Sequence, residues 1–206
     1  TASSRGIGRA IALRLGRDGA AVAVNYVASP EKAEAVVKEI IASGGRAIAI
    51  QGSVANKADV TQLFDKTEQQ LGSINIVVNV AGVSVFKPHV DLNDDDFDKI
   101  FSVNTRGAMY MLQAAATRIK DGGRIVQFST GGTKMPLSGA GLYAASKAAG
   151  EQFAFALAKE IGHRQVTVNL VSPGVTDTDG LILAQEAIDH LASQTPLGRL
   201  GQPQDI

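Results

Sequence analysis

The chain has 206 residues, 45% of them hydrophobic and 19% charged, and its 20 basic and 20 acidic side chains cancel, which leaves no basic excess for a nucleic-acid partner. The absence of cysteine excludes disulfides, thiolate catalysis and cysteine-bound zinc, and it suits a cytoplasmic protein. No apolar run reaches the roughly 20 residues that a membrane span needs, and the three histidines lie too far apart to form a metal site, so we expect neither a membrane partner nor a metal.

Glycines separate segments whose hydrophobic pattern alternates between the helical and the strand period. Residues 7–18 predict a helix with Ile7, Ile11 and Leu15 on one face, and residues 20–25 predict a short apolar strand. The next helix begins at Ser29-Pro30, a capping hydroxyl followed by a proline, and ends at the glycines of residues 44–45.

The same alternation continues along the rest of the chain. We expect a strand at 46–50, a helix at 57–71, a strand at 74–78, a helix at 94–117, a strand at 124–128, a helix at 142–161, a strand at 166–170 and a helix at 180–192. Asn93 caps the helix at 94–117, with three aspartates in its first turn. Strands this apolar are expected to be buried on both faces. The pattern predicts one α/β domain with a doubly wound parallel sheet of the Rossmann type.

Both ends of the predicted sheet are unusual. The glycine-rich turn falls at residues 1–8 with no strand before it, and a Rossmann-type sheet has such a strand at its centre. A further strand is also expected after residues 200–203. We therefore expect residues 1–206 to be an incomplete record, at both ends, of one dinucleotide-binding and catalytic domain. On this hypothesis the 206 residues alone do not fold stably, and a cooperative thermal transition would contradict it.

Five short motifs lie at strand ends or on the helices that follow. In the turn from Thr1 to Gly8, glycines allow backbone N–H groups to approach a pyrophosphate at a helix N-terminus. Tyr143 and Lys147, four residues apart, share a helix face, where an ammonium would lower the pKa of the phenol. The other three are the segment 79–82 (NVAG), Asn104 in the long helix, and the segment 169–175 with its Pro-Gly pair.

In this order, the motifs resemble those of the short-chain dehydrogenase/reductase family over essentially the whole chain. The glycine loop is similar to the family's TGxxxGIG pattern, with Ala2 in place of the first glycine, and NVAG stands where the family often has NNAG. The extra methyl of Ala2 is expected to crowd the turn if its geometry needs a glycine. The resemblance implies an enzyme that moves a hydride between a nicotinamide cofactor and a carbonyl or alcohol.

The resemblance also implies a catalytic set of Asn104, Thr130, Tyr143 and Lys147. Tyr143 would be the general acid in carbonyl reduction, Lys147 would hold the nicotinamide ribose and lower the pKa of Tyr143, and Asn104 would hold a water that links Lys147 to solvent. The family's serine lies thirteen residues before the tyrosine, a place that Thr130 takes here, with Ser129 as the alternative one residue away.

The implied cofactor site is larger and draws on every motif. It comprises Ser3, Ser4, Arg5, Gly6, Ile7, Gly8, Asn25, Tyr26, Ser53, Val54, Asn79, Ala81, Gly82, Tyr143, Lys147, Pro173, Gly174, Val175 and Thr178. Ser53 replaces an aspartate that the family often has beside the adenine. The strand end Asn25-Tyr26 has no carboxylate to repel a 2′-phosphate, with which Arg5 could pair, so we expect NADP(H) rather than NAD(H).

Three functions remain open at this point. The first is an NADP-dependent reductase of ketones, either a 3-oxoacyl reductase or a broad carbonyl reductase, acting on a small-molecule carbonyl substrate. The second is a polyol or sugar dehydrogenase of the same family, and the third is a nucleotide-binding protein without catalysis. The spacing of Leu181, Ile182, Leu183, Ile188 and Leu191 on a helix indicates core or lid packing more than a specific recognition surface, and it favours an apolar substrate. Family members are commonly homotetramers or dimers that pair the helices at 94–117 and 142–161, so we expect a homo-oligomer, with a homotetramer as the leading expectation.

Overall fold

The computed structural model describes residues 1–181 and 184–206, and its helices and strands alternate in the expected order. Their bounds are α1 Gly6–Arg17, β1 Ala21–Tyr26, α2 Pro30–Ala42, β2 Arg46–Gln51, α3 Lys57–Leu71, β3 Ile74–Asn79, α4 Asp94–Phe101, α5 Gly107–Arg118, β4 Ile119–Phe128, α6 Gly141–Ile161, β5 Thr167–Val171 and α7 Gln185–Ser193.

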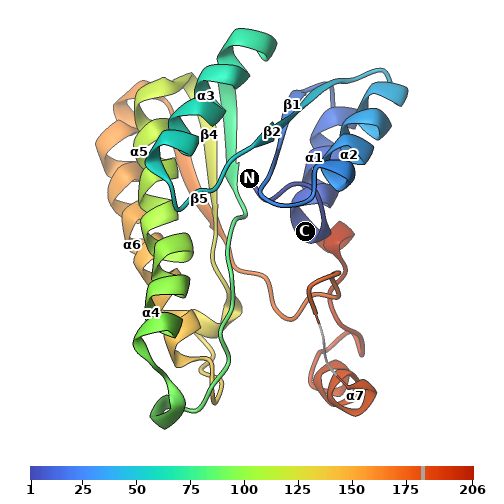
Figure 1. Cartoon of the computed structure of the whole chain (residues 1–206), viewed down its shortest axis with the longest axis vertical. Helices are drawn as coiled ribbons and strands as arrows, with labels where there is room; N and C mark the ends of the chain where they lie inside the picture. The colour runs from blue at the N-terminus through green and yellow to red at the C-terminus, as the bar shows by residue number, and fades with distance from the viewer. Residues whose placement is uncertain (182–183) are drawn as a thin grey trace.

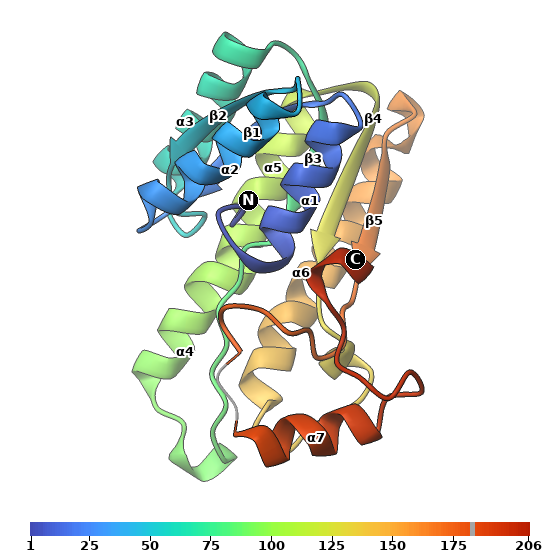
Figure 2. The same cartoon turned by 90° about the vertical axis from the view of Figure 1, so that its right-hand side faces the viewer.

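All strand pairs are parallel, and helices cover the strands on two sides, which confirms the doubly wound α/β fold. Helices α1 and α2 pack on the pair β1-β2, whereas α5 and α6 pack on the three strands β3-β4-β5 (Figure 1). Helix α3 contacts both β1-β2 and α5, so it joins the two halves of the molecule. Helix α7 lies beyond the carboxyl ends of β4 and β5 (Figure 2).

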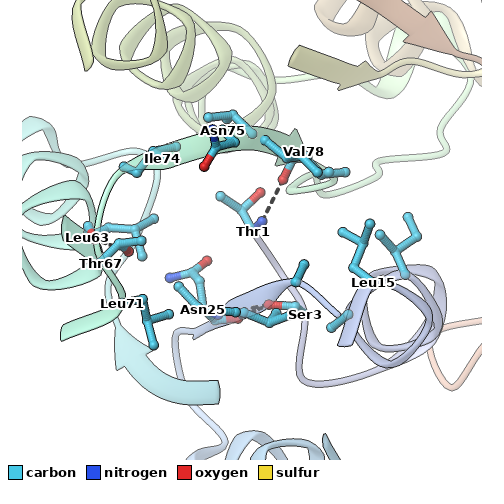
Figure 3. Close-up of a pocket in the computed structure, with 18 of the residues that line it drawn as sticks. Thr1, Ser3, Leu15, Asn25, Leu63, Thr67, Leu71, Ile74, Asn75 and Val78 are labelled. Carbon is cyan, nitrogen blue, oxygen red and sulfur yellow. Dashed lines mark hydrogen bonds between the residues drawn. The ribbon is translucent and has the colours of Figure 1, made fainter. Parts of the chain in front are cut away.

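The sheet is divided, as the position of the glycine-rich turn predicts. Strands β1 and β3 face each other across a cavity of about 560 Å³, and no strand of the described residues lies between them. Residues 1–3 lie across this space: the Thr1 nitrogen donates to the Val78 carbonyl on β3 (2.7 Å) and the Ser3 N–H donates to the Asn25 carbonyl on β1 (2.9 Å) (Figure 3).

Two apolar cores support the two halves. The larger joins α3, α5 and α6 to the strands and includes the fully buried Ile125 of β4, and the smaller lies between α1, α2 and β1-β2 around Val24. The prediction that every strand is buried on both faces is wrong for β3 and β5. Ile76 on β3 is 43% exposed and no residue of β5 is fully buried, because α1 and α2 cover only β1-β2.

Three helix predictions need correction. The helix expected at 94–117 is interrupted by a π turn at Ser102–Arg106, which separates α4 from α5; its start at Asn93 is confirmed, with a complete capping box to Asp96. Ser29 precedes α2 as expected but its hydroxyl makes no capping hydrogen bond. The last helix begins at Gln185 instead of residue 180, and Ile182 and Leu183 lie outside the described residues.

Within the described part of the chain, none of the helices combines the length and the apolar character that crossing a bilayer requires.

Candidate active site

The glycine loop is a tight turn that leads directly into α1. Gly8 is packed so closely on the turn that an added Cβ would lie 2.2 Å from the Ala2 carbonyl oxygen. Gly6 has φ +53°, and a Cβ there would contact Thr178 at 3.4 Å, so this glycine brings the loop close to the segment after β5. Backbone N–H groups at the start of α1 are therefore free of side-chain cover, which fits the predicted pyrophosphate site.

Ala2 is the strained member of this loop. Its φ is +49°, in the left-handed region that favours glycine. The turn therefore has the geometry that the family's glycine suits, and the alanine adopts it at a cost.

Asn25 and Ser3 are structural braces of the loop. The Asn25 side chain accepts from the Ala2 N–H (3.1 Å) and donates to the Gly52 carbonyl (2.9 Å), and the Asn25 N–H donates to the Ser3 hydroxyl (2.8 Å). Both residues are buried. The Asn25 side chain therefore shapes the glycine loop, and its place in the cofactor site stays a prediction.

The NVAG segment approaches the catalytic residues through Gly82. A Cβ on Gly82 would lie 2.7 Å from Lys147 Nζ and 3.2 Å from Asn104 Oδ1, so this position is closely packed by both side chains. Asn79, buried at the end of β3, instead donates to the Gln127 side chain (2.9 Å) and accepts from the Thr1 hydroxyl (2.7 Å). Asn79 thereby links the end of β3 to β4.

Asn104 lies in the π turn between α4 and α5 and is buried. Its side-chain oxygen accepts from the Val83 N–H (2.8 Å), and its nitrogen donates to the Val83 carbonyl (2.8 Å) and to Ser146 Oγ (2.9 Å). Asn104 thereby ties the loop after β3 to α6. Its relay water stays a prediction.

Tyr143 and Lys147, one turn apart on α6, both line a cavity of about 240 Å³. The walls come from four of the five motif regions, without Asn104, and are formed by Ile7, Val80, Gly82, Val83, Ser84, Phe128, Ser129, Thr130, Tyr143, Lys147, Pro173, Gly174, Thr176 and Thr178. This cavity is smaller than the space between β1 and β3, but it alone of the two gathers the phenol, the amine and the hydroxyl groups. We take it as the candidate active site.

Burial controls the titration of both groups. It raises the pKa of Tyr143, an effect that a hydrogen bond with Thr130 partly opposes, so the expected lowering of this pKa by Lys147 is wrong for the protein alone. Burial also lowers the pKa of Lys147 to about 8, and its ammonium donates to the Phe128 carbonyl (3.2 Å). Desolvation is the largest cause for both groups, since it disfavours the charged form of each.

The two candidate hydroxyls face different partners. Thr130 borders the cavity, where its hydroxyl acts to lower the pKa of Tyr143, whereas the buried Ser129 donates its hydroxyl to Glu151 Oε1 (2.5 Å). The Thr130 oxygen also accepts from the Gly132 N–H (3.2 Å), which orients its side chain.

The segment after β5 forms the remaining wall of the active-site cavity. The Pro173 carbonyl accepts from the Gly131 N–H (2.9 Å), and Gly174 and Thr178 line the cavity opposite Ile7. Val175 does not line it; its carbonyl accepts from the Gly201 N–H (3.1 Å).

Four predicted cofactor residues do not line this cavity. Ser4 is half-buried in the glycine loop and Arg5 is exposed at the N-terminus of α1. Tyr26 packs partly against the smaller core. The Ser53 N–H donates to Asp59 Oδ2 (2.9 Å). A carboxylate therefore lies beside Ser53, although it comes from position 59 in the sequence and not from position 53.

Two further predicted residues point into the protein. Val54 is buried against Gly107, and Ala81 donates its N–H to the Thr1 hydroxyl (3.1 Å). Sequence reasoning missed Ser84, Val83, Phe128 and Thr176, which line the cavity. Thr176 and Phe128 are sequence neighbours of predicted residues at strand ends. Extending each motif by one or two residues would therefore have included them.

Comparisons with known proteins identify the family of this chain. A family model described as enoyl-(acyl carrier protein) reductase matches residues 1–206. The hydroxynaphthalene reductase-like protein Arp2 of Metarhizium brunneum is 38% identical over all of this chain and 83% of its own length.

Two solved structures share the fold as well as the sequence. A short-chain dehydrogenase from Burkholderia cenocepacia in complex with NADP is 42% identical, with a TM-score of 0.93 over 98% of this chain and 83% of that one. The angucycline C-6 ketoreductase LanV with bound NADP is 34% identical, with a TM-score of 0.93 over 99% of this chain and 82% of that one. The chain belongs to the short-chain dehydrogenase/reductase family and is an NAD(P)-dependent oxidoreductase of carbonyl compounds.

Proposed function

We propose that this protein uses NADPH to reduce apolar ketones, with Tyr143, Lys147, Thr130 and Asn104 as its catalytic machinery. The observation that carries the proposal is the convergence of Tyr143, Lys147 and Thr130 on one cavity whose other walls come from the glycine loop and the segment after β5. The family membership supports an enzyme over the alternative of a nucleotide-binding protein without catalysis.

Each residue has a distinct task in carbonyl reduction. When bound, the nicotinamide supplies the hydride. The phenol of Tyr143 donates a proton to the carbonyl oxygen, and the Thr130 hydroxyl, which lines the same cavity, orients that oxygen. The ammonium of Lys147, already held by the Phe128 carbonyl, lies where it can bind ribose hydroxyls and favour the ionised phenol. Asn104 holds the loop after β3 against α6 so that these groups stay aligned.

The preference for NADP(H) rests on charge near the end of β1. The strand ends in Asn25-Tyr26, and among the residues that the structure describes Arg5 pairs with no carboxylate, so its guanidinium is available for a 2′-phosphate. Two relatives were solved with NADP, which supports the same choice.

An apolar rim beside the phenol favours a ketone over a polyol. The Phe86 ring lies 5.7 Å from the ring of Tyr143 and is 64% exposed. Met135 and Leu137, in the loop between Thr130 and Tyr143, are also exposed. Such side chains suit the aromatic or acyl part of a substrate, and the relatives described as hydroxynaphthalene reductase-like and angucycline ketoreductase support the aromatic option.

A panel of substrates tests this function. We expect NADPH to support at least about tenfold higher kcat/KM than NADH, a difference of about 1.4 kcal/mol, with aromatic ketones or 3-oxoacyl thioesters as substrates. Oxidation of polyols with NADP⁺ should be slower, and Tyr143→Phe, the control, should lower kcat by roughly 100-fold or more. A clear preference for NADH overturns the cofactor assignment, and preferred turnover of polyols overturns the substrate assignment.

Exposed aromatic residues on the helices support the expectation of a homo-oligomer. Phe97 and Phe101 stack with ring centroids 4.2 Å apart on α4, and Phe153 and Phe155 on α6 are 36% and 49% exposed. We propose that these helices pair with a second copy of the chain, as the family resemblance implies, and light scattering after gel filtration measures the resulting mass.

A further inference from the structure

Helix α6 carries a buried carboxylate in addition to the catalytic pair. Glu151 follows Lys147 by one helical turn, as Lys147 follows Tyr143, and it is only 3% exposed. None of the catalytic roles described above uses this carboxylate, and it does not line the active-site cavity.

The Glu151 carboxylate binds the loop that follows β4. Its Oε1 accepts from the Ser129 hydroxyl (2.5 Å) and from the Thr133 hydroxyl (2.7 Å), and its Oε2 accepts from Lys134 Nζ (3.3 Å). These partners lie on both sides of Thr130 along the chain, so one side chain holds the loop before and after the hydroxyl that faces Tyr143.

The rest of the loop depends on few other contacts. The Ser129 N–H donates to the Val171 carbonyl (2.8 Å) and the Gly131 N–H to the Pro173 carbonyl (2.9 Å), which fix the backbone on the β5 side. On the α6 side the contacts are those of Glu151. Thr133 Oγ1 lies 2.7 Å from Glu151 Oε1 and 3.0 Å from the Thr130 carbonyl oxygen, and its single proton can serve the shorter of these contacts, so Glu151 holds Thr133 beside the Thr130 backbone.

The chemistry of this site favours an ionised carboxylate. Burial raises the pKa of Glu151, but the hydrogen bonds from Ser129, Thr133 and Lys134 together hold it below its usual value. A carboxylate can only accept, and hydrogen bonds to a charged acceptor are about twice as strong as neutral ones. Glu151 therefore imposes one orientation on both hydroxyls.

We propose that Glu151 is a positioning residue, which holds residues 129–134 on α6 so that the Thr130 hydroxyl meets the carbonyl oxygen beside Tyr143. The proposal rests on the roles given to Thr130 and Tyr143 under the proposed function. Glu151 touches neither substrate nor cofactor. It acts through Thr130, because Tyr143 and Glu151 sit on the same rigid helix and fix the distance between the phenol and the loop.

The test is a double-mutant cycle in the complete enzyme with its best ketone and nucleotide. Glu151→Ala should lower kcat by roughly 10- to 100-fold and leave KM for the nucleotide within about twofold, since misplacing a catalytic group by about 1 Å costs that much. Glu151→Gln, which keeps an oxygen acceptor for Ser129 and Thr133, should retain activity within about threefold of wild type. Glu160→Ala, an exposed glutamate on the same helix, is the control and should change nothing.

Thr130→Ala supplies the second arm of the cycle. If Glu151 acts through Thr130, adding Glu151→Ala to Thr130→Ala should change kcat by less than about twofold. Should Glu151→Ala fail to fold, Thr133→Val, which removes one donor and keeps the carboxylate, takes its place with the same sign and a smaller loss.

Two outcomes separate this proposal from the one on which it rests. Full activity of Thr130→Ala overturns the role of Thr130 itself. An impaired Thr130→Ala beside an unimpaired Glu151→Ala, or effects that multiply in the double variant, overturns the positioning role alone.

Discussion

At the scale of single residues, the glycine loop shows how one methyl group changes a binding turn. Ala2 holds a φ of +49°, whereas Gly6 and Gly19 adopt positive φ without the steric cost of a Cβ. The Ala2 carbonyl oxygen also packs closely on Gly8, so a shift of Ala2 that relieved its strain would move the start of α1.

We expect Ala2→Gly to raise the free energy of unfolding by about 1 kcal/mol, because glycine adopts the left-handed region without strain. Chemical denaturation measures this gain, and titration of NADPH fluorescence should show equal or tighter binding. The contrasting variant Gly8→Ala, whose Cβ would meet the Ala2 carbonyl at 2.2 Å, should weaken nucleotide binding. A loss of stability in Ala2→Gly would show that the loop does not depend on this backbone geometry.

At the scale of elements, α6 buries the amine of Lys147, and this burial does not raise the stability of the fold. Burial lowers the pKa of Lys147 to about 8 from the 10.5 of an exposed lysine, so the unfolded chain binds more protons than the folded one between these values. Stability should therefore rise with pH across this window, and below it the folded state carries the full cost of the buried charge.

We expect Lys147→Met to abolish turnover and to stabilise the protein at pH 7, by up to about 3 kcal/mol, since it removes that buried charge and keeps the apolar stem. Urea denaturation between pH 7 and pH 10 measures the change, and the gain should shrink as the pH rises toward 10. A gain that is independent of pH would point to packing instead of charge.

The elements also show what sequence reasoning can reach. The bounds of α3 and the cap at Asn93 were predictable because their signals are local: a capping side chain, a period of apolar residues and a glycine stop. The π turn at Ser102–Arg106 was not, since it depends on Asn104 reaching across to Val83 and Ser146. Likewise Tyr143, Lys147 and Thr130 could be named from spacing, whereas the structural use of Asn25 and Asn79 required knowing which strand ends meet.

At the scale of the whole molecule, the sheet consists of two parts, whose strands differ in the number of neighbouring strands with which they pair. Strand β4 is paired on both sides, by β3 and β5, whereas β1 and β3 each border the cavity of about 560 Å³ on one side. The two parts are joined by α3 and by the contacts of residues 1–3 with Val78 and Asn25. Local opening should therefore begin at the cavity.

Hydrogen exchange tests this expectation. Amides of β4 should exchange most slowly, and those of β1 and β3 faster, because each of the latter strands has a partner on one side only. Exchange of β1 amides as slow as that of β4 would contradict the division. Saturating NADPH should slow exchange in β1 and the glycine loop, which the nucleotide would bridge to the other part.

The row of Tyr143, Lys147 and Glu151 along one face of α6 has a consequence for how such an enzyme can change its selectivity. A displacement of α6 would move all three side chains together. Natural substitutions that change the ketone selectivity of the enzyme should therefore not occur on this face of the helix. Adaptive substitutions should instead accumulate at Phe86, Met135 and Leu137, whose exposed side chains can be exchanged without disturbing the shared frame.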